Sequence, residues 1–147
     1  NDHPDLAQAV FSVGKAYWDK SHAKRHLELI EDQHNYLRKA LGKWDLIIHD
    51  LPNNGGWLAD SCYYSGDCYR LLQDDLNAIQ TYSEFVGRWP NDRRAPNAQF
   101  LIGQAYEQLA GGDIHSAAYA KAMLAYQQLI DDYPNSYAAQ VAASRMQ

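Results

Sequence analysis

The sequence predicts an all-α protein, a right-handed solenoid of three helical hairpins followed by one C-terminal helix. Two repeated patterns predict this fold class. A glycine is followed three residues later by tyrosine at Gly14–Tyr17, Gly66–Tyr69 and Gly103–Tyr106. A small, an aromatic and a large apolar residue then precede proline with identical spacing at Ala40-Trp44-Ile47-Pro52, Ala78-Tyr82-Phe85-Pro90 and Ala122-Tyr126-Leu129-Pro134.

The residue types in these patterns suit two packed antiparallel helices. Alanine, aromatic and large apolar residues at i, i+4 and i+7 form one apolar stripe along a helix. Small residues such as Gly66 and Ala78 let the two helices approach, and the rings beside them fill the remaining space. The closing proline ends the second helix because it moves the residue before it out of α conformation.

The patterns predict one domain over residues 1–147. Its repeats are expected at about 5–52, 57–90 and 95–134, with a terminal helix at 137–147. That helix has no second helix after it, so it either caps the apolar end of the array or belongs to a longer array of which this chain is a segment.

The first and third hairpins carry extra length. Tyr17 and Ala40 are 23 positions apart and Tyr106 and Ala122 are 16 apart, against 9 in the middle hairpin. We place the extra residues at the start of each second helix, with Ser21 and Asp113 as N-caps. The second helix of the first hairpin then runs from about 22 to 50 and overhangs its partner. The overhang carries an apolar stripe that includes Leu27, Ile30 and His34. Either a partner protein, a second copy or a longer first helix covers it.

The repeated small and aromatic positions with a closing proline resemble the tetratricopeptide repeat over nearly the whole chain. The stretch from Tyr126 to Ser136 resembles bacterial cell-envelope members of that family, of the type of the barrel-assembly lipoprotein and the Tol-Pal coordination protein. The resemblance implies a scaffold that binds proteins, located in a bacterial cell envelope or periplasm, with the cytoplasm as the alternative.

The resemblance also implies a concave groove lined by the first helix of each hairpin. In register with the three glycines, the aromatic residues three positions earlier are Phe11, Tyr63 and Phe100, which either line the groove or pack between repeats. The polar and aromatic residues expected beside them are Lys15, Trp18, Asp60, Asp67, Arg70, Asn97, Gln104 and Glu107. Asp67 and Gln104 stand where a carboxylate clamp needs lysine and asparagine, so we do not expect chaperone tails as ligands.

Other functions are disfavoured by composition and motifs. The net charge of −5 counts against nucleic-acid binding, and no apolar run reaches the roughly 20 residues of a membrane span. His22 and His26 have metal-ligand spacing but lack a third ligand, and Cys62 and Cys68 lie too far apart on one helix to form a disulfide. We therefore expect no enzyme, cofactor or metal. The favoured function is a scaffold or adaptor for a protein partner; the alternative is a structural or oligomerisation subunit that self-associates.

Overall fold

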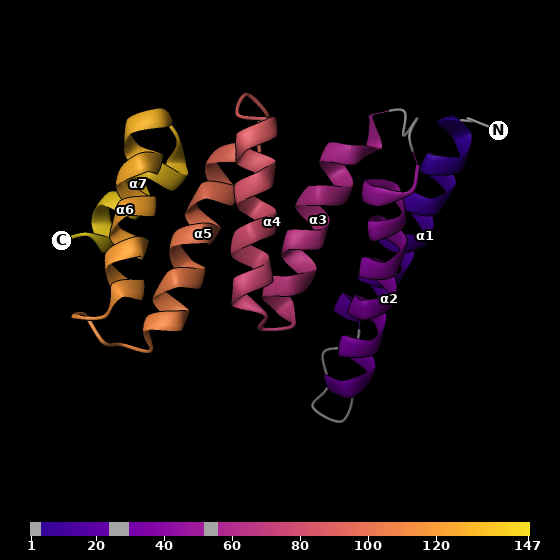
Figure 1. Cartoon of the computed structure of the whole chain (residues 1–147), viewed down its shortest axis with the longest axis horizontal. Helices are drawn as coiled ribbons and strands as arrows, with labels where there is room; N and C mark the ends of the chain where they lie inside the picture. The colour runs from indigo at the N-terminus through magenta and orange to yellow at the C-terminus, as the bar shows by residue number, and fades with distance from the viewer. Residues whose placement is uncertain (1–3, 24–29, 52–55) are drawn as a thin grey trace. The chain divides into compact units, whose positions relative to one another are not determined.

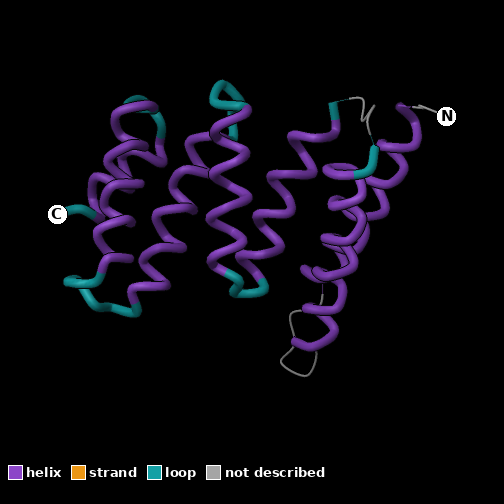
Figure 2. Tube along the Cα trace, in the orientation of Figure 1, coloured by secondary structure: helices purple, strands orange, loops and turns teal. Residues whose placement is uncertain are grey.

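The computed structural model describes residues 4–23, 30–51 and 56–147, and all regular secondary structure within these ranges is helical (Figures 1 and 2). The helices are α1 (Pro4–Ala23), α2 (Ile30–His49), α3 (Trp57–Leu71), α4 (Asp75–Arg88), α5 (Ala95–Ala110), α6 (Ala117–Asp132) and α7 (Tyr137–Arg145). The predicted all-α helical-repeat class is confirmed.

The helices fall into two compact units. The first unit, Asn1–Asp74, contains α1, α2 and α3, and the second, Asp75–Gln147, contains α4 to α7. The two helices of the predicted middle hairpin belong to different units, so the predicted approach of Gly66 and Ala78 stays a prediction. So does the single domain over residues 1–147.

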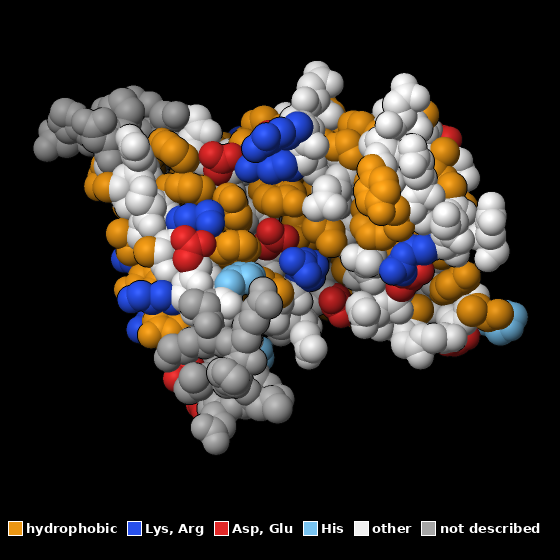
Figure 3. Space-filling view, turned by 180° about the vertical axis from the view of Figure 1, so that it is seen from behind, with side chains coloured by type: hydrophobic (Ala, Val, Ile, Leu, Met, Phe, Trp, Pro, Cys, Tyr) orange, Lys and Arg blue, Asp and Glu red, His pale blue; other side chains and the backbone are white. Residues whose placement is uncertain are grey.

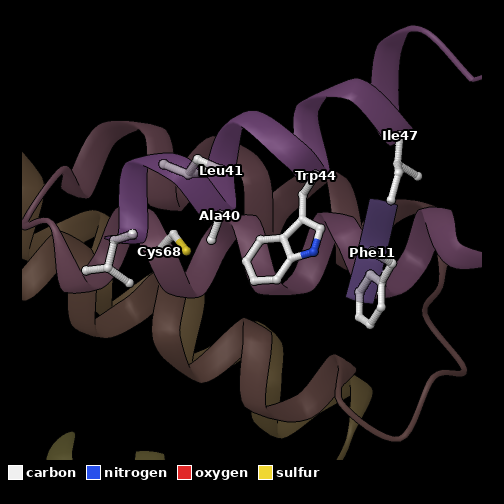
Figure 4. Close-up of a cluster of buried hydrophobic side chains, with 7 residues drawn as sticks. Phe11, Ala40, Leu41, Trp44, Ile47 and Cys68 are labelled. Atoms are coloured by element: carbon white, nitrogen blue, oxygen red, sulfur yellow. The ribbon is translucent and has the colours of Figure 1, made fainter. Parts of the chain in front are cut away.

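In the first unit, α1 and α2 form a hairpin closed by aromatic packing. Gly14 lies against the indole of Trp44, and a Cβ atom at Gly14 would come within 2.5 Å of its Nε1 atom. The glycine therefore makes room for a ring of the opposite helix, which is fully buried. The core around it contains Phe11, Leu37, Ala40, Leu41, Trp44, Ile47 and Cys68 (Figure 4).

The predicted start of the second helix at about residue 22 is wrong. Helix α1 continues to Ala23, and Ser21 is not an N-cap: its hydroxyl donates a 2.6 Å hydrogen bond to the carbonyl of Trp18. A serine that bonds back to the preceding turn is compatible with a helix interior. The described part of α2 begins at Ile30. Helix α1 is therefore longer than the sequence predicted, whereas the overhang and its covering stay predictions.

Of the overhang residues, Leu27 lies outside the described residues, and so does the side chain of Ile30, which begins α2. His34 is half-buried within α2.

The second unit repeats the glycine–ring contact. A Cβ atom at Gly103 would lie 2.3 Å from the ring of Tyr126, which is fully buried. Asp113 is not the N-cap of α6; Ser116 is, and its hydroxyl accepts from the amide of Tyr119. The extra residues of this hairpin are shared by both helices and the loop, because α5 runs to Ala110 and α6 begins at Ala117.

Candidate protein-binding surfaces

A hollow of about 290 Å³ lies between α5 and α7 in the second unit. Three of the predicted groove residues line it: Asn97, Phe100 and Gln104. Its other wall comes from α7 and is lined by Tyr137, Ala138, Val141 and Arg145. The register of the glycines thus identified the α5 wall. The α7 residues were missed because no glycine–tyrosine pair marks that helix.

Arg145, which lines the hollow, belongs to a network around one carboxylate. Glu107 accepts a 2.9 Å hydrogen bond from the phenol of Tyr126 and also bonds to Arg145. The Arg145 guanidinium lies 5.5 Å from the ring centre of Phe100. Burial, and then the bond to Glu107, raise the pKa of Tyr126 above its usual range. Glu107, a predicted contact residue, therefore also ties three helices together.

The rim of the hollow combines one exposed ring with amide groups. The Tyr137 side chain is 80% exposed. Asn97 and Gln104 carry side-chain amides, which both donate and accept hydrogen bonds. The volume is at the lower end of the range for ligand pockets, roughly 300–1,000 Å³, and suits one or two side chains of a bound peptide.

A second hollow, of about 410 Å³, lies between α4, α5 and α6. On α5 it is lined by Gln99, Ile102 and Tyr106, which face away from the α5–α7 hollow. Gln99 donates its amide to the carbonyl of Ala125, so this buried polar group is already satisfied. Leu124 at its edge is 70% exposed.

In the first unit, Phe11 does not offer a free ring to a partner. It is 8% exposed and stacks on Trp57 of α3 with ring centres 4.8 Å apart. For this residue, packing between helices is the alternative that the structure supports.

The other two predicted groove residues on α1, Lys15 and Trp18, also contact side chains of the protein itself. Trp18 packs edge-on against Tyr64 of α3 and against the ring of His22. Lys15 lies 4.4 Å above the Trp18 ring and pairs with Asp19 at 2.8 Å.

The predicted residues of α3 lie on one helix face, since 60, 63, 67 and 70 follow helical spacing. Asp67 is 9% exposed and faces Arg70 at 3.4 Å. Tyr63 is half-buried and meets Tyr64 edge-on at 6.0 Å. Asp60 is half-buried as well. This face mixes a ring with both signs of charge.

The histidines and cysteines considered as metal ligands or reactive groups make structural contacts where the structure describes them. His22 bonds to the hydroxyl of Ser21 and the carbonyl of Trp18, and His26 lies outside the described residues. Cys62 and Cys68 are buried and not joined in a disulfide. Burial, together with the charge of Asp67, raises the pKa of the Cys68 thiol far above its usual range, which opposes formation of a nucleophilic thiolate.

Residues 4–23, 30–51 and 56–147 contain no group of three His, Cys, Asp or Glu side chains able to hold a metal ion. None of the helices described is both long and apolar enough to cross a membrane. Figure 3 shows hydrophobic side chains interspersed with charges of both signs on the face it displays, not one basic field.

Helical hairpins that are closed by the same glycine–ring contact, Gly14–Trp44 in one unit and Gly103–Tyr126 in the other, are typical of helical-repeat proteins. Residues 60–92 and 97–136 match the tetratricopeptide repeat family. These two stretches therefore contain tetratricopeptide repeats, and such repeats generally mediate protein–protein interaction. The predicted repeat at 5–52 is not among the matched residues and stays a prediction. No curated protein matched the chain.

Proposed function

We propose that this protein is a non-catalytic scaffold or adaptor that holds a segment of a protein partner in the α5–α7 hollow. The observation that carries the proposal is the convergence of Asn97, Phe100 and Gln104 with the exposed Tyr137 around one depression. A ring beside amide groups is suited to a peptide, because the ring contacts a side chain and the amides bond to the backbone.

The proposed mode of binding leaves the fold of the second unit unchanged. Phe100 and Arg145 are already held in place by Tyr126 and Glu107, so the walls of the hollow are largely preformed. A preformed site loses less conformational entropy when it binds. The first unit adds the mixed face of α3 as a further candidate contact.

The proposal includes a bacterial cell-envelope location, which the resemblance of residues 126–136 supports. Cell fractionation with an antibody to the chain tests this location. Self-association through an overhanging helix stays a prediction, because Leu27 and the side chain of Ile30 lie outside the described residues.

The binding proposal is tested by affinity purification and mass spectrometry with matched variants. Tyr137→Ala combined with Val141→Asp alters the α7 wall of the hollow, whereas Leu124→Ala removes an exposed side chain that lines the other hollow. We expect the first variant to lose at least one partner that wild type and Leu124→Ala both retain. Equal recovery by all three proteins, with unchanged circular dichroism, overturns the assignment of this hollow.

A further inference from the structure

The hollow between α4, α5 and α6, which we call the α4–α6 hollow, combines an apolar centre with an open wall. Its centre is formed by the buried residues Ile102 and Ala125, and Leu124 beside them is largely exposed. The α4 wall contains Gly87, where a Cβ atom would meet nothing within 4 Å. The hollow of about 410 Å³ therefore has room for an apolar side chain that would cover Leu124.

Lys121 is the one charged side chain among the residues that line the α4–α6 hollow. Its Nζ atom lies 5.8 Å from the ring centre of Tyr106, another lining residue. Within the described part of the chain, Lys121 makes no ion pair with a carboxylate, and no carboxylate lines the hollow. The hollow therefore presents an unpaired positive charge beside apolar surface.

Carboxylates elsewhere on α4 and α6 do not cancel the charge of Lys121. Glu84 of α4 pairs with Arg88 at 3.1 Å. Asp132 lies on the same line of α6 as Lys121, but about 16 Å from it by helical rise. Lys121 and Asp132 are both exposed, and exposed charges further apart than about 10 Å are largely screened at about 0.1 M salt. The Lys121 end of the hollow is therefore cationic.

The spacing between this cation and the apolar centre matches an extended peptide. On α6, Lys121 comes one helical turn before Ala125, which is about 6 Å along the axis. On the antiparallel α5, Tyr106 comes one turn after Ile102, so both helices place the cation and its ring at the same end. In an extended segment, side chains at i and i+2 point to the same side and lie about 6.6 Å apart. An apolar and an acidic residue with this spacing reach both places at once.

We propose that the α4–α6 hollow binds an extended segment of a partner protein in which an apolar and an acidic residue are separated by one residue. The apolar side chain covers Ile102 and Leu124, and the carboxylate pairs with Lys121. Ser83 and Gln128, on the two walls, bond to the backbone of the segment. This surface is separate from the α5–α7 hollow, so the inference goes beyond the proposed function.

Two other occupants fit the α4–α6 hollow less well. Two turns of a helix about 10 Å across would fill roughly 800 Å³, about twice the volume of the hollow. A fatty acid offers a carboxylate and an apolar tail, but the tail leaves the polar groups of Ser83 and Gln128 covered and without partners. A peptide backbone supplies those partners.

The test uses the whole chain and short fluorescent peptides with a background of glycine, serine and glutamine. Two acidic peptides carry leucine two positions before or two positions after glutamate, because an extended segment can run in either direction. Matched versions of each replace the glutamate by glutamine or by lysine. Anisotropy gives the dissociation constants, decanoate is the fatty acid for comparison, and light scattering reports the oligomeric state.

We expect one of the acidic peptides to bind wild type at least about tenfold more tightly than its glutamine and lysine versions. Lys121→Glu should transfer this preference to the lysine version, whereas Lys43→Glu, at an exposed position of the first unit, leaves it unchanged. Gly87→Leu should weaken binding of the acidic peptide at least about tenfold, because the new side chain occupies the hollow. Leu109→Ser, which alters an exposed residue that does not line the hollow, should have no effect.

The proposal is wrong if the glutamine versions bind wild type as tightly as the acidic peptides, or if Lys121→Glu keeps the acidic preference. It is also wrong if neither acidic peptide saturates below about 5 mM, if decanoate binds more tightly than both, or if the chain forms a dimer that Gly87→Leu dissociates. Lys121 is on the surface and Gly87 has room for a side chain, so we expect both variants to fold, which circular dichroism verifies.

Discussion

Tyr126 and Glu107 connect α6 to α5 through a 2.9 Å hydrogen bond, and Arg145 of α7 bonds to the same carboxylate oxygen. One carboxylate thus joins three helices in a partly buried position. We expect Glu107→Gln to lower the free energy of unfolding by about 1 kcal/mol, since it replaces a charge-assisted bond by a neutral one. Hydrogen exchange should become faster in α7. Unchanged exchange there would show that this network does not hold the helix.

Two glycine substitutions with opposite expected effects on stability test the glycine–ring contact. Gly103→Ala places a methyl group 2.3 Å from the Tyr126 ring, and we expect it to destabilise the protein by about 2 kcal/mol. Gly87→Ala, in helix α4, meets nothing within 4 Å and should stabilise it by up to about 1 kcal/mol through helix propensity. Urea denaturation compares the two. The same sign for both substitutions would contradict the packing described.

Alkaline pH should weaken the fold through Cys68. Its pKa is raised above the ordinary value of 9.0 by burial and by Asp67. Above that value the unfolded chain loses the thiol proton while the folded chain keeps it, so stability is intact below about pH 9 and falls as pH rises. The loss approaches about 1.4 kcal/mol per pH unit.

Cys68→Ala should remove this loss between about pH 9 and 10, before the tyrosines contribute. The control is Ser65→Ala, which alters a buried residue of the same helix that does not titrate in this range. Denaturation midpoints across the pH range give the slope. A slope that Cys68→Ala leaves unchanged rules out the thiol as its source.

The N-cap of α7 tests how firmly the wall of the α5–α7 hollow is held. The Ser136 hydroxyl accepts from the amide of Ala139 at 3.1 Å. We expect Ser136→Ala to cost about 1 kcal/mol and to weaken partner binding, because α7 has only nine residues. Ser144→Ala, near the exposed end of the same helix, should do neither. Thermal denaturation and partner recovery are the measurements.

Low pH should act on the turn before α5. Asp92 accepts hydrogen bonds from the backbone, Nε and Nη2 of Arg94, at 2.8, 3.0 and 2.9 Å. These bonds hold the pKa of Asp92 below its usual value of 3.8. The stability they contribute is therefore complete above about pH 4 and is lost as pH falls through the lowered pKa. Asp92→Asn should flatten the acid limb of a stability–pH curve; an identical limb contradicts this.

The helical class was predictable because the spacing from Ala122 to Pro134 reports a local periodicity. Helix limits were less accessible: Ser21 is typical of an N-cap, yet packing of α1 against α2 and α3 carries the helix past it. Phe11 and Phe100 occupy the same register, but Phe11 stacks on Trp57 while Phe100 lines a hollow. That difference depends on which helix packs opposite each ring, and local sequence spacing does not report tertiary packing. The position of Tyr137 beside Phe100 depends on tertiary packing in the same way.

The engagement of Arg145 with Glu107 decides what kind of ligand the neighbouring hollow prefers. An anionic ligand can pair with the Arg145 guanidinium only by displacing the Glu107 carboxylate. The free energy of the Arg145–Glu107 contact is then subtracted from that of binding. A neutral segment meets no such competitor. We therefore expect the hollow to disfavour acidic peptides, although Arg145 considered alone would suggest the opposite preference.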